Sequence, residues 1–185
     1  PAAEPAADFS GEARRLYERA LSIQQAALGP DHADVAFSLG RMSSIQRELG
    51  QLEAARALEA RALEISERTN GPDHRITGQH LIDLAFLLRE LGEYEAAQPL
   101  FERSLAISQR VWGPDHPEVQ IRLTQLAVLL QTMGRYEAAK PLYERALAIE
   151  QEVFAELAVR IAAAERELAA LAGALADLDA TAALA

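Results

Sequence analysis

The chain repeats itself at an interval of 42 residues. The segment 91–107 returns with few changes as the segment 133–149. A period between about 20 and 50 residues is typical of stacked arrays, in which each unit packs on its neighbours. A second marker, the tetrapeptide Gly-Pro-Asp-His, keeps the same interval and occurs at residues 29–32, 71–74 and 113–116.

Each marker indicates the end of one helix and the start of the next. Gly can adopt the left-handed conformation at a helix end, and Pro cannot continue the helix. Asp31 is placed to cap the following helix by accepting from its free N–H groups, and Asp34 puts negative charge into the first turn. Asp73 and Asp115 take the same place in the other two markers. We therefore expect Asp to be the N-cap in every repeat.

Apolar residues at helical spacing on both sides of each marker predict an all-α fold. The short loops make the two helices of a repeat antiparallel. Because each pair alone leaves an apolar face open, the pairs should stack into a solenoid. The predicted organisation is a disordered segment at 1–8, an array at 9–152 and a C-terminal helix at 153–185. Within the array we expect a half repeat at 9–28 and full repeats at about 31–69, 73–111 and 115–152.

Composition argues against several classes of function. The formal net charge is −10, so we expect neither nucleic acid nor an anionic membrane as a partner. The absence of cysteine excludes disulfides and zinc–thiolate sites, and no apolar run is long enough to span a bilayer. The chain begins at Pro1 without a signal-peptide pattern. We interpret it as a cytoplasmic segment cut from a longer chain.

The marker histidines, His32, His74 and His116, do not predict a metal site. Residues one repeat apart lie about 8–10 Å from each other, whereas zinc ligands lie about 2 Å from the ion. No Ser/His/Asp set has a plausible shared site, and Gly-Pro-Asp-His lacks the lysine of a phosphate loop. We therefore predict no metal, no cofactor and no enzyme activity, and we place His80 on the surface or in a groove.

The second and third full repeats match the tetratricopeptide pattern of small and large apolar residues. Alanines allow two helices to approach closely, and leucines and aromatic residues fill the gaps between them. The matching residues are Leu81, Leu84, Ala85, Leu88, Ala97 and Phe101 in one repeat, and Leu123, Leu126, Ala127, Leu130, Ala139 and Tyr143 in the next. With the 42-residue period, the Gly-Pro-Asp-His joint and the run Tyr-Glu-Arg-Ala-Leu-Ala-Ile, the segment 10–152 resembles the kinesin-light-chain-type class of tetratricopeptide repeats.

This resemblance implies a right-handed superhelical solenoid and a role in protein–protein interaction. Kinesin light chain binds cargo peptides with its repeats. Similar arrays occur in bacterial proteins beside signalling or protease-like domains, so a regulatory domain of a larger protein is an alternative. The class often carries Asn in the middle of the first helix, where it holds the backbone of a bound peptide. The equivalent positions here are Arg41, Asp83 and Gln125.

In such a stack the first helices line the concave face, where a peptide or helix of a partner protein would bind. Arg47 and Arg89 stand one repeat apart and suit a carboxylate of the partner. The alternative is that they pair with Glu48 and Glu90 or with solvent. The predicted groove residues are Phe37, Ile82, Phe86 and Val128 as an apolar floor, with Arg41, Arg47, Gln79, Asp83, Arg89 and Gln125.

The first full repeat departs from the pattern. Ser43, Gln46 and Glu59 stand where the other repeats have alanine, leucine and an aromatic residue. We expect this helix pair either to pack less tightly or to turn a polar face toward another group.

No Gly-Pro marker occurs near Ala155, so the helix that starts near Tyr136 should continue without a break. Arg160, Glu165 and Glu167 flank a heptad pattern of apolar residues in this segment. One interpretation is a capping helix folded over the last repeat. The other is a coiled coil that forms a homodimer or binds a partner helix. The heptad positions are Phe154, Leu157, Ile161, Ala164, Leu168, Leu171, Leu175 and Leu178.

Overall fold

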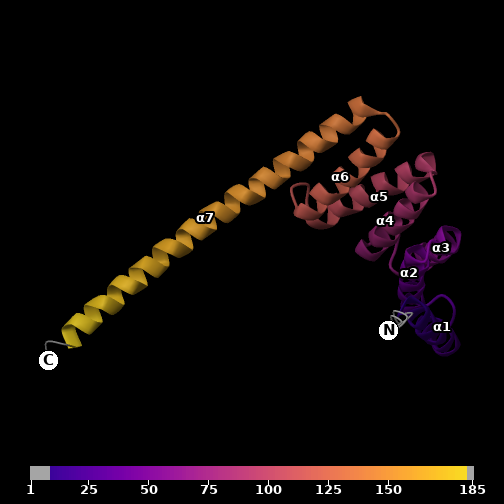
Figure 1. The fold of residues 1–185 in the computed structure, drawn as a ribbon, viewed down its shortest axis with the longest axis horizontal. Coiled ribbons are helices and arrows are strands. Elements are labelled where there is room, and N and C mark those ends of the chain that lie inside the picture. The colour runs from indigo at the N-terminus through magenta and orange to yellow at the C-terminus, as the bar shows by residue number, and fades with distance from the viewer. Residues whose placement is uncertain (1–8, 183–185) are drawn as a thin grey trace, which may run out of the picture.

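The computed structural model describes residues 9–182, and within this range it contains helices joined by short turns and no strand (Figure 1). The predicted all-α fold is confirmed. The segment 1–8, predicted to be disordered, lies outside the described residues. The helices are α1 (Phe9–Leu28), α2 (Ala33–Glu48), α3 (Leu52–Thr69), α4 (Arg75–Glu90), α5 (Tyr94–Trp112), α6 (Pro117–Thr132) and α7 (Tyr136–Ala182).

Each helix packs against the next one along the chain, from α1 to α7. The turn inside each repeat depends on a glycine, for which Gly92 is an example. Its φ of 81° lies in the left-handed region that side chains disfavour. This conformation lets the Glu93 N–H donate to the Leu88 carbonyl at 2.8 Å and the Gly92 N–H donate to the Arg89 carbonyl at 3.1 Å. The last carbonyls of α4 are thereby paired, and α5 begins at once.

The N-caps differ from the prediction, because the histidine of each marker takes this role and the aspartate does not. The His74 ring accepts a hydrogen bond at Nδ1 from the Ile76 N–H at 3.2 Å. His32 and His116 do the same for Asp34 and Glu118. The aspartate stands one position too early to reach these amides, and it pairs instead with an arginine of the helix that closes the repeat. The pairs are Asp31 with Arg61 and Arg68, Asp73 with Arg110, and Asp115 with Arg145.

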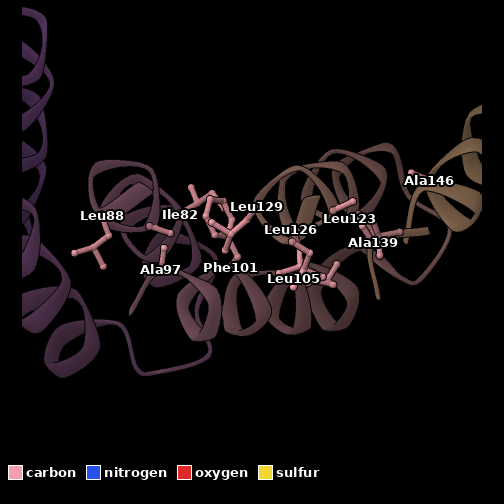
Figure 2. Close-up of a cluster of buried hydrophobic side chains, with 14 of the residues drawn as sticks. Ile82, Leu88, Ala97, Phe101, Leu105, Leu123, Leu126, Leu129, Ala139 and Ala146 are labelled. Atoms are coloured by element: carbon pink, nitrogen blue, oxygen red, sulfur yellow. The ribbon is translucent and has the colours of Figure 1, made fainter. Parts of the chain in front are cut away.

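The apolar core of the second and third repeats is one continuous cluster (Figure 2). Phe101 is fully buried, and its ring lies edge-on to that of Phe86 with 5.4 Å between the centroids. The alanines that were predicted to allow close approach are buried. They are Ala85, Ala97, Ala127 and Ala139.

The first full repeat has a smaller core of its own, formed by Val35, Ala36, Leu39, Ala62 and Ile65. Two of the three polar residues that break the pattern there, Ser43 and Glu59, are buried and hydrogen-bonded, whereas Gln46 is half-buried and its Oε1 has no hydrogen-bond partner within the described residues. The Ser43 hydroxyl donates to the Ala55 carbonyl at 3.0 Å, and Glu59 is only 1% exposed beside His80. Glu59 is thus directed at the neighbouring repeat, whereas Ser43 bonds within its own repeat.

The last helix, α7, runs from Tyr136 to Ala182 without interruption, as the missing marker predicts. Its first part packs on α6, and the rest extends away from the array (Figure 1). The capping interpretation is not met in the structure, because folding back would need a turn after residue 152 and none occurs. The side chains from Glu150 to Ile161 are all exposed.

We expect His74→Ala to lower the free energy of unfolding by about 1 kcal/mol, because the first turn of α4 loses its side-chain cap. Asp73→Ala removes an exposed, solvent-screened ion pair with Arg110 and should cost clearly less. Urea denaturation of the two variants measures the difference. A larger loss for Asp73→Ala would return the capping role to the aspartate.

Candidate peptide-binding groove

A cavity of about 770 Å³ opens beside α2 and α4, and the C-terminal turns of α5 and the first turns of α6 complete its wall. We call it the α2–α4 cavity. Its mouth carries four exposed apolar side chains, one or two from each of three helices. These are Phe37 of α2, Ile76 of α4, and Val111 and Trp112 of α5.

Four of the predicted groove residues line this cavity: Phe37, Arg41, Gln79 and Asp83. Arg41 lies over the Phe37 ring, with 5.1 Å from its guanidinium carbon to the ring centroid. Ile82 is a correction, since it is 1% exposed and belongs to the core, where no partner can reach it. The remaining predicted residues do not line the cavity. They are Arg47, Phe86, Arg89, Gln125 and Val128.

The two arginines predicted to receive a carboxylate are already engaged. Arg47 Nε donates to both carboxylate oxygens of Glu90, at 2.9 and 3.0 Å, and this hydrogen bond raises the pKa of Arg47. Arg89 lies over the Phe86 ring, with 4.9 Å to the ring centroid. The alternative expectation of pairing with Glu90 therefore holds for Arg47. A partner carboxylate would have to displace Glu90 to bind there.

The base of the cavity contains a buried polar pair that the sequence analysis did not anticipate. His80 Nδ1 and Glu59 Oε1 are 2.6 Å apart, and both residues are buried. Gly40 of α2 leaves room for this pair, because a Cβ at that position would lie 3.2 Å from His80 Cε1. His80 thus lines the cavity from a buried position, so of its two expected placements the groove applies and the surface does not. The signal in the sequence was Glu59 itself, a carboxylate at an aromatic position.

Asp83 lies next to this pair and is half-buried. Burial raises the pKa of its carboxyl group, and the nearby negative charge of Glu59 adds to the increase. Gln79 Nε2 donates to both oxygens, at 3.0 and 3.1 Å, which acts in the opposite direction. Among the described residues, no cationic side chain lies within salt-bridge distance of Asp83. The cavity therefore presents a partly desolvated carboxylate that lacks an ionic partner.

Arg122 closes the other side of the cavity and is 8% exposed. Its guanidinium donates to Glu118, to Gln125 Oε1 at 3.2 Å and to Gln79 Oε1 at 3.4 Å. Its Nε is buried and has no hydrogen-bond partner. Arg122 therefore connects α6 to the residue that donates to Asp83, and it keeps one donor unused.

The polar residues that line the α2–α4 cavity do not form a metal-binding site. Within the described residues, no group of three or more His, Asp or Glu side chains is arranged to hold a metal ion. In the same range, no helix combines the length and apolar character needed to cross a membrane.

Comparison with known proteins identifies the array. The family model described as "Tetratricopeptide repeat" matches residues 8–68, 60–110 and 76–152. The chain is a tetratricopeptide repeat protein. The family and the fold are typical of non-enzymatic scaffolds and of protein–protein interaction modules.

Solved structures with a similar fold include other tetratricopeptide repeat proteins. BtubC (BKLC) from P. vanneervenii is 24% identical with a TM-score of 0.73, and the match covers 78% of this chain and 57% of that one. A putative kinesin light chain from Podosopora anserina with nearly identical TPR-like repeats is 24% identical with a TM-score of 0.67, covering 78% and 68%. At this level of identity the likeness shows the fold alone. No curated protein is significantly similar to the chain.

Aspartyl phosphate phosphatase F from Bacillus subtilis also shares the fold, at 19% identity and a TM-score of 0.63. The match covers 75% of this chain but 35% of that protein. The matched fold thus makes up about a third of that longer chain.

We expect Glu59→Ala to lower the free energy of unfolding by about 2 kcal/mol, because it leaves a buried His80 nitrogen unpaired. His80→Ala should cost a similar amount, and the double variant should cost clearly less than the sum. Chemical denaturation of the three variants gives the coupling. Glu64→Ala, an exposed position of the same helix, is the control. Additive effects of Glu59→Ala and His80→Ala would show that the pair is not an interaction.

Proposed function

We propose that this tetratricopeptide repeat protein binds a peptide segment of a partner protein in the α2–α4 cavity. The observation that carries the proposal is the combination of an apolar mouth with the Asp83 carboxylate inside, which has a hydrogen bond from Gln79 but no ion-pair partner among the described residues. A volume of about 770 Å³ lies within the range of about 300–1,000 Å³ that is common for ligand pockets. It suits a few side chains of an extended or helical segment and is too small for a folded domain.

The apolar mouth supports the anchoring part of this function. The side chains of Phe37, Ile76 and Trp112 are each at least 41% exposed to solvent. A peptide segment bound in the cavity would bury these exposed apolar side chains. Burial of such side chains contributes about 1.5–3 kcal/mol each when it is complete. An apolar side chain of the partner between these residues would therefore supply most of the affinity.

Asp83 supports a preference for a basic residue in the bound segment. A lysine or arginine side chain of the partner would place its charge against the carboxylate and replace the water lost by burial. The protein carries a formal net charge of −10, which also favours approach of a basic segment. The partner chemistry proposed is thus an apolar anchor with a lysine or arginine nearby, in contrast to the acidic partner that Arg47 and Arg89 suggested.

The proposal is tested by selecting peptides from a displayed random library and measuring their binding in solution. Trp112 is the only tryptophan of the chain and lines the cavity, so its fluorescence reports occupancy. We expect Phe37→Glu or Ile76→Glu to weaken binding by about tenfold or more, since each puts an unpaired charge at the apolar mouth. Leu147→Glu changes an exposed leucine of α7 and should leave the affinity unchanged. Equal binding by all the variants would place the peptide site elsewhere.

The variant Asp83→Asn should raise the stability of the fold at neutral pH. The folded pKa of Asp83 is raised, so its contribution to stability is complete below about pH 3.9 and declines as the pH rises through the folded pKa. We therefore expect Asp83→Asn to raise the melting temperature at pH 7 and to lose this advantage near pH 3. Thermal melts at the two pH values measure the effect.

The same variant should abolish the preference for a basic side chain. A selected peptide that contains lysine is compared with a copy in which norleucine replaces lysine. Wild type should bind the lysine form more tightly, whereas Asp83→Asn should bind the two alike. If wild type does not distinguish them, Asp83 has no part in recognition.

A further inference from the structure

The distal part of α7 carries a stripe of exposed large apolar residues. The five large heptad residues whose side chains are described are between 48% and 66% exposed, namely Phe154, Leu157, Ile161, Leu168 and Leu171. Leu175 and Leu178, the last predicted positions, have side chains outside the described set. Apolar residues along one face of a helix add no stability while that face is exposed to water. Such a stripe therefore indicates a surface that another molecule covers.

The stripe continues the face of α7 that already packs in the array. Ala146 is buried there, and Leu157 and Leu168 follow it at intervals of 11 residues. Eleven residues make three turns with an excess of only about 20°, so the three side chains lie nearly on one line. Helix α6 packs antiparallel to the first part of α7, so the contact between them stops where α6 begins, at Pro117, whereas α7 continues beyond it. The distal part of α7 therefore has no neighbouring helix among the described residues to pack on its apolar face.

We propose that a second copy of this chain covers the stripe, so that two α7 helices pair as a homodimeric coiled coil. The heptad places Phe154, Ile161 and Leu168 at a positions and Leu157, Ala164 and Leu171 at d positions, and the combination of Ile161 at a with Leu157 at d is typical of two strands. This proposal does not depend on the peptide site in the α2–α4 cavity.

The charges beside the stripe are self-complementary, which favours a second copy over an unrelated helix. Arg160 occupies a g position, Glu165 an e position and Glu167 the next g position. In a parallel pair, Arg160 of one chain faces Glu165 of the other, and in an antiparallel pair it faces Glu167. The twofold symmetry repeats the contact, so that either orientation gains two ion pairs. Within the described residues, none of these three side chains has an ion-pair partner in its own chain.

Pairing through α7 would place two α2–α4 cavities in one molecule. A partner with two binding segments, or a surface that presents many, would then be held by both cavities at once. The effective concentration at the second site gives a gain in affinity that no single array can reach.

The test is the solution mass of the 185-residue chain by light scattering at increasing concentration. We expect a mass of twice 20.1 kDa. The double variant Leu157→Glu with Leu168→Glu should have the monomer mass, because it places charges inside the proposed seam. Val159→Glu is the matched control, since Val159 is 66% exposed on the same helix but lies off the seam. Circular dichroism should show the same helical content for all three proteins.

A monomeric wild type at every concentration would overturn the proposal, as would a dimer that the double variant leaves intact. Substitutions of the charged residues beside the stripe provide a second test. Glu165→Arg should weaken a parallel dimer and Glu167→Arg an antiparallel one, and adding Arg160→Glu should restore the one that is weakened. A dimer that neither change weakens would contradict the proposed charge pairing along the seam.

Discussion

The fold depends on close contact between helices at alanine positions. Ala85 with Ala97 and Ala127 with Ala139 are buried where the two helices of a repeat meet. A larger side chain at any of these positions would push the helices apart, and the leucines and aromatic residues between them would lose contact. Because each repeat contacts only its neighbours, the same contact recurs along the array and sets its geometry.

The first full repeat shows what happens when this apolar rule is broken. Glu59 takes the place of an aromatic residue and is buried, so its carboxylate must have a partner. That partner, His80, belongs to the next repeat, and the pair therefore joins α3 to α4 across the repeat boundary. Asp83 then stands beside a second carboxylate with little water around it. The polar base of the α2–α4 cavity is thus a consequence of one substitution in the repeat pattern.

The two surfaces with a proposed partner lie in different parts of the molecule and use different physics. The cavity is concave, combines apolar and charged groups, and suits a short segment. The distal part of α7 is a long helix that extends away from the array (Figure 1). It carries an apolar stripe with charged residues beside it, and it suits another long helix. The array could therefore bind a peptide while α7 is paired, since the residues involved do not overlap.

The sequence by itself determined the helices, their joints, the uninterrupted α7 and the family. These follow from signals between near neighbours, such as Gly92 with its positive φ, and from a period that repeats them. It also indicated four residues of the cavity. Only the tertiary structure decided that Glu90 neutralises Arg47 and that Ile82 is buried. The His74 cap of α4 is a contact between near neighbours that the sequence pattern did not distinguish from a cap by Asp73. The His80–Glu59 pair joins residues 21 positions apart, and packing alone brings such side chains together and removes their water.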